Sequence, residues 1–437
     1  MAKSPNGTTS NYSYDEANRL KALDHLGGTT SFARFDYAYN NVSNRKSRTE
    51  TDNGKKVLDA YDYDAIDQVA GAKYNFNAQA NTQDRLVNYA YVVVGNRLEL
   101  TDEKSIGYAT NNLNQYVTVG DDTPTYDLNG NLKSQGIWTY AYDAENRLRA
   151  ASDGTTGYAF AYDARNRCVS RAAPASFKYC YYDGWNLIEE LDANWNLLAR
   201  YLHGAKTDEL VARNEGSAPH YYYADALGNN VALTSGFFGN TPVERYSYDI
   251  FGAPTFRDGS GNVIASSAYD NRFLFTGREY LPELGLYDYR HRIYSPNLGR
   301  FLQTDPIRFG GRDVNLYRYV YNNPFNLLDP TGELVFPGWV PPILIDIGER
   351  AAAGAVIGTV FEPGAGTVIG AIAGAFLFPS TAEAPTSGDS LPPVRRHCWK
   401  VADECIDGER HCTFECDDGT ATHGTGDECE DDEYWDF

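Results

Sequence analysis

A short motif recurs through most of this chain, and it constrains the fold more than any other feature. A copy has aromatic residues two positions apart, then Asp, two variable residues, Asn or Gly, and a basic or apolar residue. Aromatic residues two apart lie on one face of a β-strand. Asp and Asn favour tight turns because they hydrogen-bond their own backbone and tolerate positive φ. The clearest copies span residues 12–20, 140–148 and 160–168, and looser copies start at Tyr61, Tyr126 and Tyr246. The repeat therefore predicts a series of antiparallel hairpins.

Composition and charge narrow the function. The chain has 34 tyrosines and 40 glycines but one methionine, which favours short strands and tight turns. Its formal charge of −21 argues against a general nucleic-acid-binding role, because phosphate backbones are repelled. Residues 398–437 hold 14 acidic and 2 basic side chains, so the last forty residues form a separate region. We find no phosphate loop, zinc-protease motif or nucleophile elbow, and we predict no cofactor and no metal site.

A denser run of motifs occupies residues 220–332. It contains Gly285-Leu-Tyr-Asp-Tyr-Arg, then Gly299-Arg-Phe, then two Asp-Pro pairs at Asp305 and Asp329, the second followed by Thr-Gly. Together with the repeats, this run resembles the YD (RHS) repeat family, found in bacterial Rhs proteins, in the C component of insecticidal Tc toxins and in teneurins. The run itself is similar to the RHS-associated core domain of polymorphic toxins.

The resemblance implies an all-β fold in which YD-repeat hairpins form a spiralling sheet, part of a hollow shell that the core plugs. We expect repeats over 1–200, the core over 201–334, a linker with an apolar helical hairpin over 335–395, and an acidic, Cys-rich variable tail over 396–437. The chain enters a repeat almost at its start, and exposed β edges are normally paired. Upstream RHS repeats or a shell-completing partner are therefore expected. The start has no apolar signal segment, so a secreted or cell-surface location rests on the resemblance.

The two Asp-Pro pairs are the strongest candidate for chemistry. Two carboxylates held close together cannot both ionise, so they share a proton and can act as acid and base on a water. Many family members cut their own chain just beyond the Asp-Pro-x-Gly motif. The resemblance thus implies that Asp305 and Asp329 are the catalytic pair, with Arg300 as helper, and that the cut lies just after Gly332. The alternative is that each Asp-Pro merely starts a turn.

The cleavage region departs from the family pattern at one position. Members that cleave usually have Asp-Pro-x-Gly-Leu, whereas here Glu333 follows Gly332 and the leucine is Leu334. A charged residue in an apolar subsite is costly to desolvate. We expect cleavage to be shifted by one residue, slowed or lost, and Glu333→Leu to restore or speed it.

Two further features follow the core. Residues 351–361 and 364–378 are apolar arms with glycines every four residues, flanking Glu362-Pro363. Each arm is shorter than the ~20 residues that span a bilayer, and the spacing predicts a helical hairpin. The hairpin is either buried inside the shell or inserts into a target-cell membrane, and the first alternative is favoured.

The tail carries five cysteines within 32 residues. A unit of forty residues needs cross-links to hold together, and the spacings lack the Cys-x-x-Cys pairs of ordinary zinc modules. Disulfides are therefore the first expectation and zinc the second. One cysteine stays over unless it pairs with Cys168 or Cys180. The candidates are Cys398, Cys405, Cys412, Cys416 and Cys429.

Three functions remain open. The first is a polymorphic toxin or delivery protein whose shell encloses and presents a variable C-terminal segment, released by aspartyl autoproteolysis. An immunity protein is a candidate partner of such a toxin. The second is a cell-surface adhesion protein whose aromatic repeats bind glycans or a partner protein. The third is a fragment without activity of its own.

Overall fold

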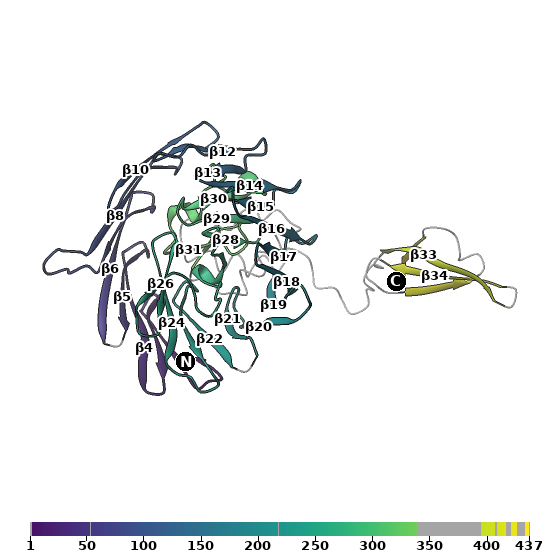
Figure 1. Ribbon diagram of the computed structural model, residues 1–437, viewed down its shortest axis with the longest axis horizontal. Coiled ribbons are helices and arrows are strands. Elements are labelled where there is room, and N and C mark those ends of the chain that lie inside the picture. Colours follow the sequence, from purple (N-terminus) through teal and green to yellow (C-terminus); the bar gives the residue numbers. More distant parts are fainter. Residues whose placement is uncertain are drawn as a thin grey trace, which may run out of the picture. The chain divides into compact units, whose positions relative to one another are not determined.

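The computed structural model describes residues 2–52, 54–216 and 218–338, and in the tail the strand backbones 395–406, 409–416, 421–425 and 433–436. The chain divides into two units, Met1–Val356 and Ile357–Phe437. The described part of the first unit holds two large antiparallel sheets whose strands pair in chain order. Figure 1 shows these sheets curving around a smaller group of strands.

The first sheet has eleven strands. They are β1 (Ala2–Lys3), β2 (Thr9–Tyr14), β3 (Leu20–Gly27), β4 (Thr30–Tyr39), β5 (Arg45–Asp52), β6 (Lys55–Tyr63), β7 (Val69–Tyr74), β8 (Arg85–Tyr91), β9 (Arg97–Thr101), β10 (Ser105–Thr110) and β11 (Tyr116–Val119).

The second sheet has fifteen strands. They are β12 (Thr125–Tyr126), β13 (Leu132–Gln135), β14 (Trp138–Tyr142), β15 (Leu148–Ser152), β16 (Gly157–Tyr162), β17 (Cys168–Ala173), β18 (Ser176–Asp183), β19 (Asn186–Leu191), β20 (Leu197–His203), β21 (Leu210–Asn214), β22 (Pro219–Ala224), β23 (Asn230–Ser235), β24 (Pro242–Tyr248), β25 (Pro254–Asp258) and β26 (Val263–Ile264). The expected boundary after residue 200 falls inside β20, so this sheet continues from the repeats into the core.

The central strands form two small sheets. They are β27 (Glu279–Leu281), β28 (Leu286–Tyr289), β29 (Arg292–Ser295) and β30 (Arg300–Phe301), then β31 (Leu327–Leu328) with β32 (Phe336–Pro337). Three short 3-10 turns accompany them: η1 (Phe275–Gly277), η2 (Arg308–Gly311) and η3 (Val320–Asn322).

The described residues contain no α-helix, and the predicted all-β fold is confirmed. The expected hairpin at 351–361 and 364–378 lies outside the described residues. In the second unit, one sheet joins β33 (Arg395–Ile406), β34 (Glu409–Cys416), β35 (Ala421–Thr425) and β36 (Glu433–Asp436).

Each repeat turn is closed by its own aspartate. In the copy at Asp163, the carboxylate Oδ1 accepts the backbone N–H of Arg165 at 2.8 Å and that of Arg167 at 3.0 Å. Asn166 between them has φ of 62°. The Arg167 Nε donates to the second carboxylate oxygen of Asp163 at 2.7 Å. A side chain that binds the backbone two and four residues on fixes the turn without help from the rest of the fold.

The motif tyrosines link successive hairpins. The Tyr142 hydroxyl donates to the Leu132 carbonyl at 2.8 Å, and the Tyr162 hydroxyl donates to the Leu148 carbonyl at 3.0 Å. Each acceptor is the residue that opens the strand after the preceding turn. The tyrosine thus packs its ring on the sheet, and its hydroxyl donates a hydrogen bond to the neighbouring hairpin.

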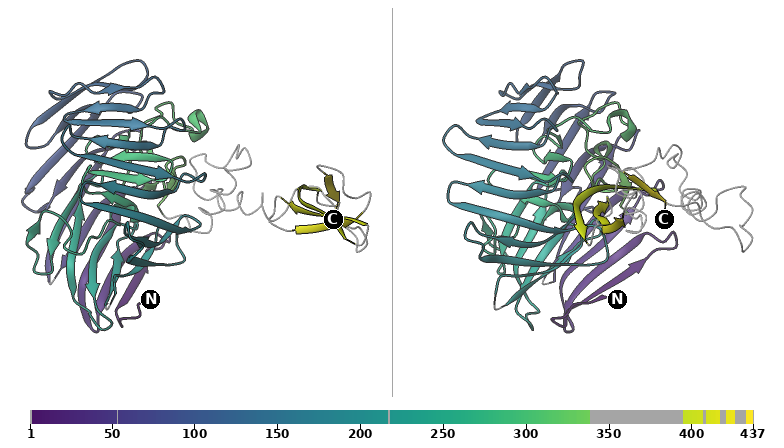
Figure 2. Two further views of the ribbon diagram at one scale, coloured as in Figure 1. Left: turned by 45° about the vertical axis from the view of Figure 1, so that its right-hand side comes forward. Right: turned by 90° about the vertical axis from the view of Figure 1, so that its right-hand side faces the viewer.

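The centre of the first unit is aromatic and fully buried. Tyr287, Tyr289, Tyr294 and Tyr319 are each 0 % exposed and pack around Phe301. Their hydroxyls have partners: that of Tyr289 lies 3.0 Å from that of Tyr319, and that of Tyr294 donates to a backbone carbonyl at 2.7 Å. Buried hydroxyls without partners would be costly, so these bonds fix one arrangement of the core. Figure 2 shows the central strands between the two sheets from two further directions.

We expect Tyr162→Phe to lower the free energy of unfolding by about 1 kcal/mol, because the Leu148 carbonyl loses its donor. Tyr181→Phe is the matched control, since Tyr181 lies on the neighbouring strand pair and is 42 % exposed. Chemical denaturation of both variants measures the difference. An equal effect of the two substitutions would contradict the linking role of the motif tyrosines.

Candidate functional site

The two Asp-Pro aspartates meet at one arginine, although they are far apart in the sequence. Asp305 follows β30, Asp329 follows β31, and Arg292 opens β29. The Arg292 Nη2 lies 3.0 Å from Asp305 Oδ2 and 3.2 Å from Asp329 Oδ2. All three residues are buried, at 3 % exposure for Arg292, 7 % for Asp305 and 2 % for Asp329. The two carboxyls thus meet at one guanidinium nitrogen, and their role as a catalytic pair stays a prediction.

Asp329 also holds the backbone that follows it. Its Oδ1 accepts the N–H of Glu333 at 3.0 Å and the N–H of Leu334 at 3.1 Å. Burial raises the pKa of Asp329, while Arg292 and these backbone donors oppose the rise.

Asp305 holds its proton up to near-neutral pH. Burial raises the pKa of Asp305 to about 7, with Arg292 lowering it and Asp329 raising it further. One guanidinium serves two carboxyls here, so the pair retains a proton well above the pH at which a free carboxyl loses its own. This is the electrostatic arrangement of an acid–base pair of carboxyls.

Three consecutive side chains hydrogen-bond the backbone carbonyls of the segment between Asp329 and Glu333. Arg290 donates to the Pro330 carbonyl at 3.0 Å, the imidazole of His291 bonds the Thr331 carbonyl at 3.0 Å, and Arg292 Nε donates to the Gly332 carbonyl. The segment therefore lies in one register against the start of β29.

Gly332 is required by this close fit. Its φ is +73°, and a Cβ added there would lie 2.5 Å from the Tyr289 carbonyl oxygen. No other residue could place its carbonyl on Arg292 without moving the backbone.

The arginine that serves the carboxyl pair differs from the one expected. Arg300 donates to the Asn114 carbonyl at 2.8 Å and to Asn96 Oδ1 at 2.6 Å, which ties the core to two repeat turns. The position beside the carboxyls belongs to Arg292. Nearness in sequence favours Arg300, which lies five residues before Asp305. The sequence signal for Arg292 is the basic run Arg290-His291-Arg292.

Glu333 lies at the edge of this site. Burial and the neighbouring Asp329 raise the pKa of Glu333 to about 7, and Arg292 opposes the rise. Its carboxylate Oε2 is 3.7 Å from His291 Nδ1. Burial lowers the pKa of His291.

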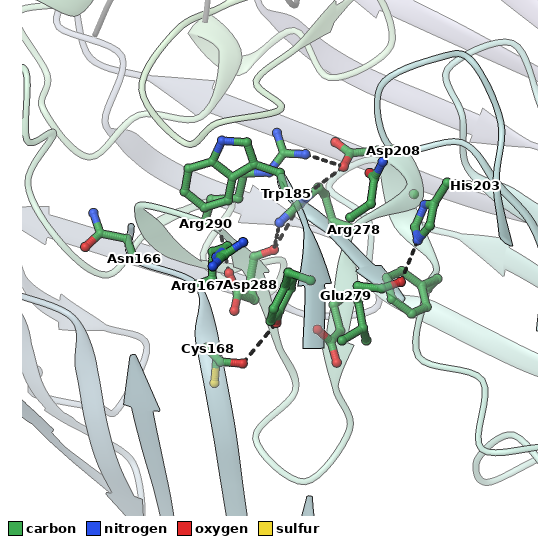
Figure 3. A pocket seen from close by; sticks show the side chains of 15 residues that line it. Asn166, Arg167, Cys168, Trp185, His203, Asp208, Arg278, Glu279, Asp288 and Arg290 are labelled. Carbon is green, nitrogen blue, oxygen red and sulfur yellow. Dashed lines mark hydrogen bonds and ion pairs between the residues drawn. The ribbon is translucent and has the colours of Figure 1, made fainter. Parts of the chain in front are cut away.

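A small cavity of about 40 Å³ lies beside Arg290 and is also lined by Trp185 and His203. It has room for a few waters and no more. Figure 3 shows Arg290 and Arg278 converging on Asp208 at one side of it.

The tail cysteines are described through backbone register alone. In the β33–β34 register, the backbone of Cys398 lies opposite that of Cys416, and the backbone of Cys412 lies opposite that of Asp403. Disulfide formation there stays a prediction, and Cys429 lies outside the described residues. Cys168 and Cys180 are buried free thiols.

The described residues contain no group of three side chains that could hold a metal ion. They also contain no helix long and apolar enough to cross a membrane.

Comparison with known families decides the classification. The model of the teneurin YD-shell family matches residues 2–325. The chain belongs to this family. The matched span includes Arg292 and Asp305, whereas Asp329 lies beyond its end.

Relatives of this YD-shell chain include bacterial toxins. It is 31 % identical over 264 residues to the tRNA3(Ser)-specific nuclease WapA of Bacillus spizizenii, covering 57 % of this chain and 11 % of that protein. It is 41 % identical over 82 residues to the toxin protein Tse5 of Pseudomonas aeruginosa, covering 19 % of this chain and 6 % of that one. The chain thus spans about a tenth of the WapA relative's length.

A solved structure shares the fold. A crystal structure of TcdB2-TccC3 without its hypervariable C-terminal region matches with a TM-score of 0.60 and 18 % identity, covering 75 % of this chain and 18 % of that one.

Asp305→Asn should flatten the pH dependence of unfolding. Because the pKa of Asp305 rises from 3.8 to about 7 on folding, the folded chain holds a proton that the unfolded chain releases. This stabilisation is full below the unfolded pKa and is lost as the pH rises through about 7. Denaturation between about pH 5 and pH 8 should show a slope shallower by up to about 1.4 kcal/mol per pH unit. Asp121→Asn, at an exposed position, is the control; a variant slope equal to the wild-type slope would contradict the assignment.

Proposed function

We propose that this chain is the shell-and-core part of a polymorphic-toxin-type protein that presents a C-terminal segment and frees it by cutting its own backbone. The observation that carries the proposal is the contact of one peptide bond with Arg292 and Asp329, and of Arg292 with Asp305. The Gly332 carbonyl accepts from Arg292 Nε, and the Glu333 N–H donates to Asp329 Oδ1 at 3.0 Å. Arg292 also joins Asp305 to Asp329.

These contacts suggest a role for each group. Asp329, whose Oδ1 accepts two backbone N–H groups, takes a proton from the attacking water, and Arg292 stabilises the charge that develops on the Gly332 oxygen. Asp305, which holds its proton up to near-neutral pH, delivers that proton to the leaving nitrogen. The products are a carboxylate at Gly332 and an amine at Glu333, with one water consumed.

The position of the segment supports enclosure. Residues 329–332 are all buried, and β31 lies inside the curve of the two sheets (Figure 1). A cut at Gly332 would therefore free everything that follows from a point within the shell. Secretion or surface delivery, upstream repeats or another shell-completing chain, and an immunity protein belong to the same proposal, supported by the toxin relatives.

Intact-mass measurement of the purified chain tests the cut directly. We expect a shell fragment ending at Gly332 and a tail fragment beginning at Glu333, separated only on denaturation. Asp305→Asn and Asp329→Asn should each leave the chain whole and folded, because Asn keeps the shape but cannot exchange the proton. Fragments ending one residue later would move the cut to the Glu333–Leu334 bond. If the wild type and Glu333→Leu both stay whole under native conditions, self-cleavage is wrong.

A pair of arginine substitutions decides which cation serves the reaction. Arg292→Lys should slow cleavage by about 100-fold or more, since a lysine cannot bond the Gly332 carbonyl and both carboxyls at once. Arg300→Lys should cleave at the wild-type rate, because Arg300 bonds Asn96 and Asn114 instead. Fragment yield over time measures both, with circular dichroism as the folding control. The opposite order of rates would return the role to Arg300.

A further inference from the structure

The side chain of Glu333 is mostly enclosed, near the imidazole of His291 and within the electrostatic influence of Arg292. It is 16 % exposed, and the His291 imidazole, 20 % exposed, is 3.7 Å from its carboxylate. Among the described residues, no other ion pair to Glu333 is present. A carboxyl so enclosed needs a polar neighbour, because an apolar wall would leave it unsolvated.

A hydrogen bond to the backbone fixes the imidazole in place. Its Nδ1, the same atom that lies 3.7 Å from the Glu333 carboxylate, is 3.0 Å from the Thr331 carbonyl, so this nitrogen carries the hydrogen. The ring packs edge-on against Trp185 with centroids 5.4 Å apart.

Trp185 is held in turn. The Arg290 guanidinium lies over its ring at 5.4 Å and bonds Asp208 at 2.9 Å. Figure 3 shows Trp185, Arg290 and Asp208 together at this side of the cavity. Asp208 belongs to the β20–β21 loop of the large sheet, so the shell itself sets the position of the imidazole.

We propose that His291 is the specificity-determining residue of the cleavage site. Its imidazole forms the wall of the subsite that takes the side chain of residue 333, and it makes that subsite accept a glutamate. The inference rests on the proposed self-cleavage and adds the substrate preference of the same site. Glu333 then fits the subsite of this chain, whereas the sequence alone suggested that its charge hinders cleavage.

The imidazole has two contacts that must be separated. One is to the Thr331 carbonyl, which does not involve the side chain at 333, and the other is to the Glu333 carboxyl at 3.7 Å. Removing the imidazole in both backgrounds isolates the second contact, because the first is lost equally in each.

The test is a double-mutant cycle on the full chain, with cleavage followed by intact mass. His291→Ala should slow cleavage at least about tenfold when Glu333 is present, and by less than about threefold in the Glu333→Leu background. If His291→Ala lowers the melting temperature, His291→Asn replaces it in the cycle.

The outcomes separate the two proposals. Equal slowing in both backgrounds, or no slowing with Glu333, overturns the role of His291 and leaves self-cleavage standing. A whole wild type beside a cleaving Glu333→Leu chain does the same, since the subsite would then reject glutamate. If no chain of the cycle cleaves, self-cleavage itself fails, and the subsite with it.

Discussion

The structure depends first on a hydrogen bond between an aspartate side chain and its own turn. In the motif copies the Asp Oδ1 accepts two backbone N–H groups, from the residues two and four positions on. Asp127 Oδ1, for example, accepts the N–H groups of Asn129 and Asn131. The residue before the last donor takes a positive φ, which Asn and Gly tolerate. Because the turn closes locally, every strand leaves it in a fixed register, and hairpins can be added one after another without a crossover.

The row of turns becomes the support of the core. The Tyr317 hydroxyl donates to the Gly130 carbonyl at 2.6 Å, and Asn322 donates to the Gly95 carbonyl at 2.8 Å. Arg300 bonds the turns at Asn96 and Asn114 in the same manner. The core is thus hydrogen-bonded to glycine and asparagine residues of the repeat turns. Changes to the repeat turns would therefore move the core as well as the sheet.

The candidate site holds more carboxyls than cations. Asp305, Asp329 and Glu333 gather near one buried guanidinium, that of Arg292, and the pKa of each carboxyl is raised by burial. Such a group is a poor source of stability, because ionised carboxyls that exceed their cations repel one another when buried. The group lies at the end of a segment held by Arg290, His291 and Arg292.

The sequence by itself determined the hairpins, the all-β class and the two Asp-Pro carboxyls, because these depend on residues a few positions apart. The Asp163 turn needs only the next four residues. What the tertiary structure decided were contacts between distant segments. Arg292 reaches Asp329 across 37 residues, while Arg300, nearer to Asp305 in sequence, points to repeat turns instead. His291 likewise meets Glu333 only because the chain returns beside β29. Sequence spacing cannot give such pairings, since they follow from how the core folds back on itself inside the sheets.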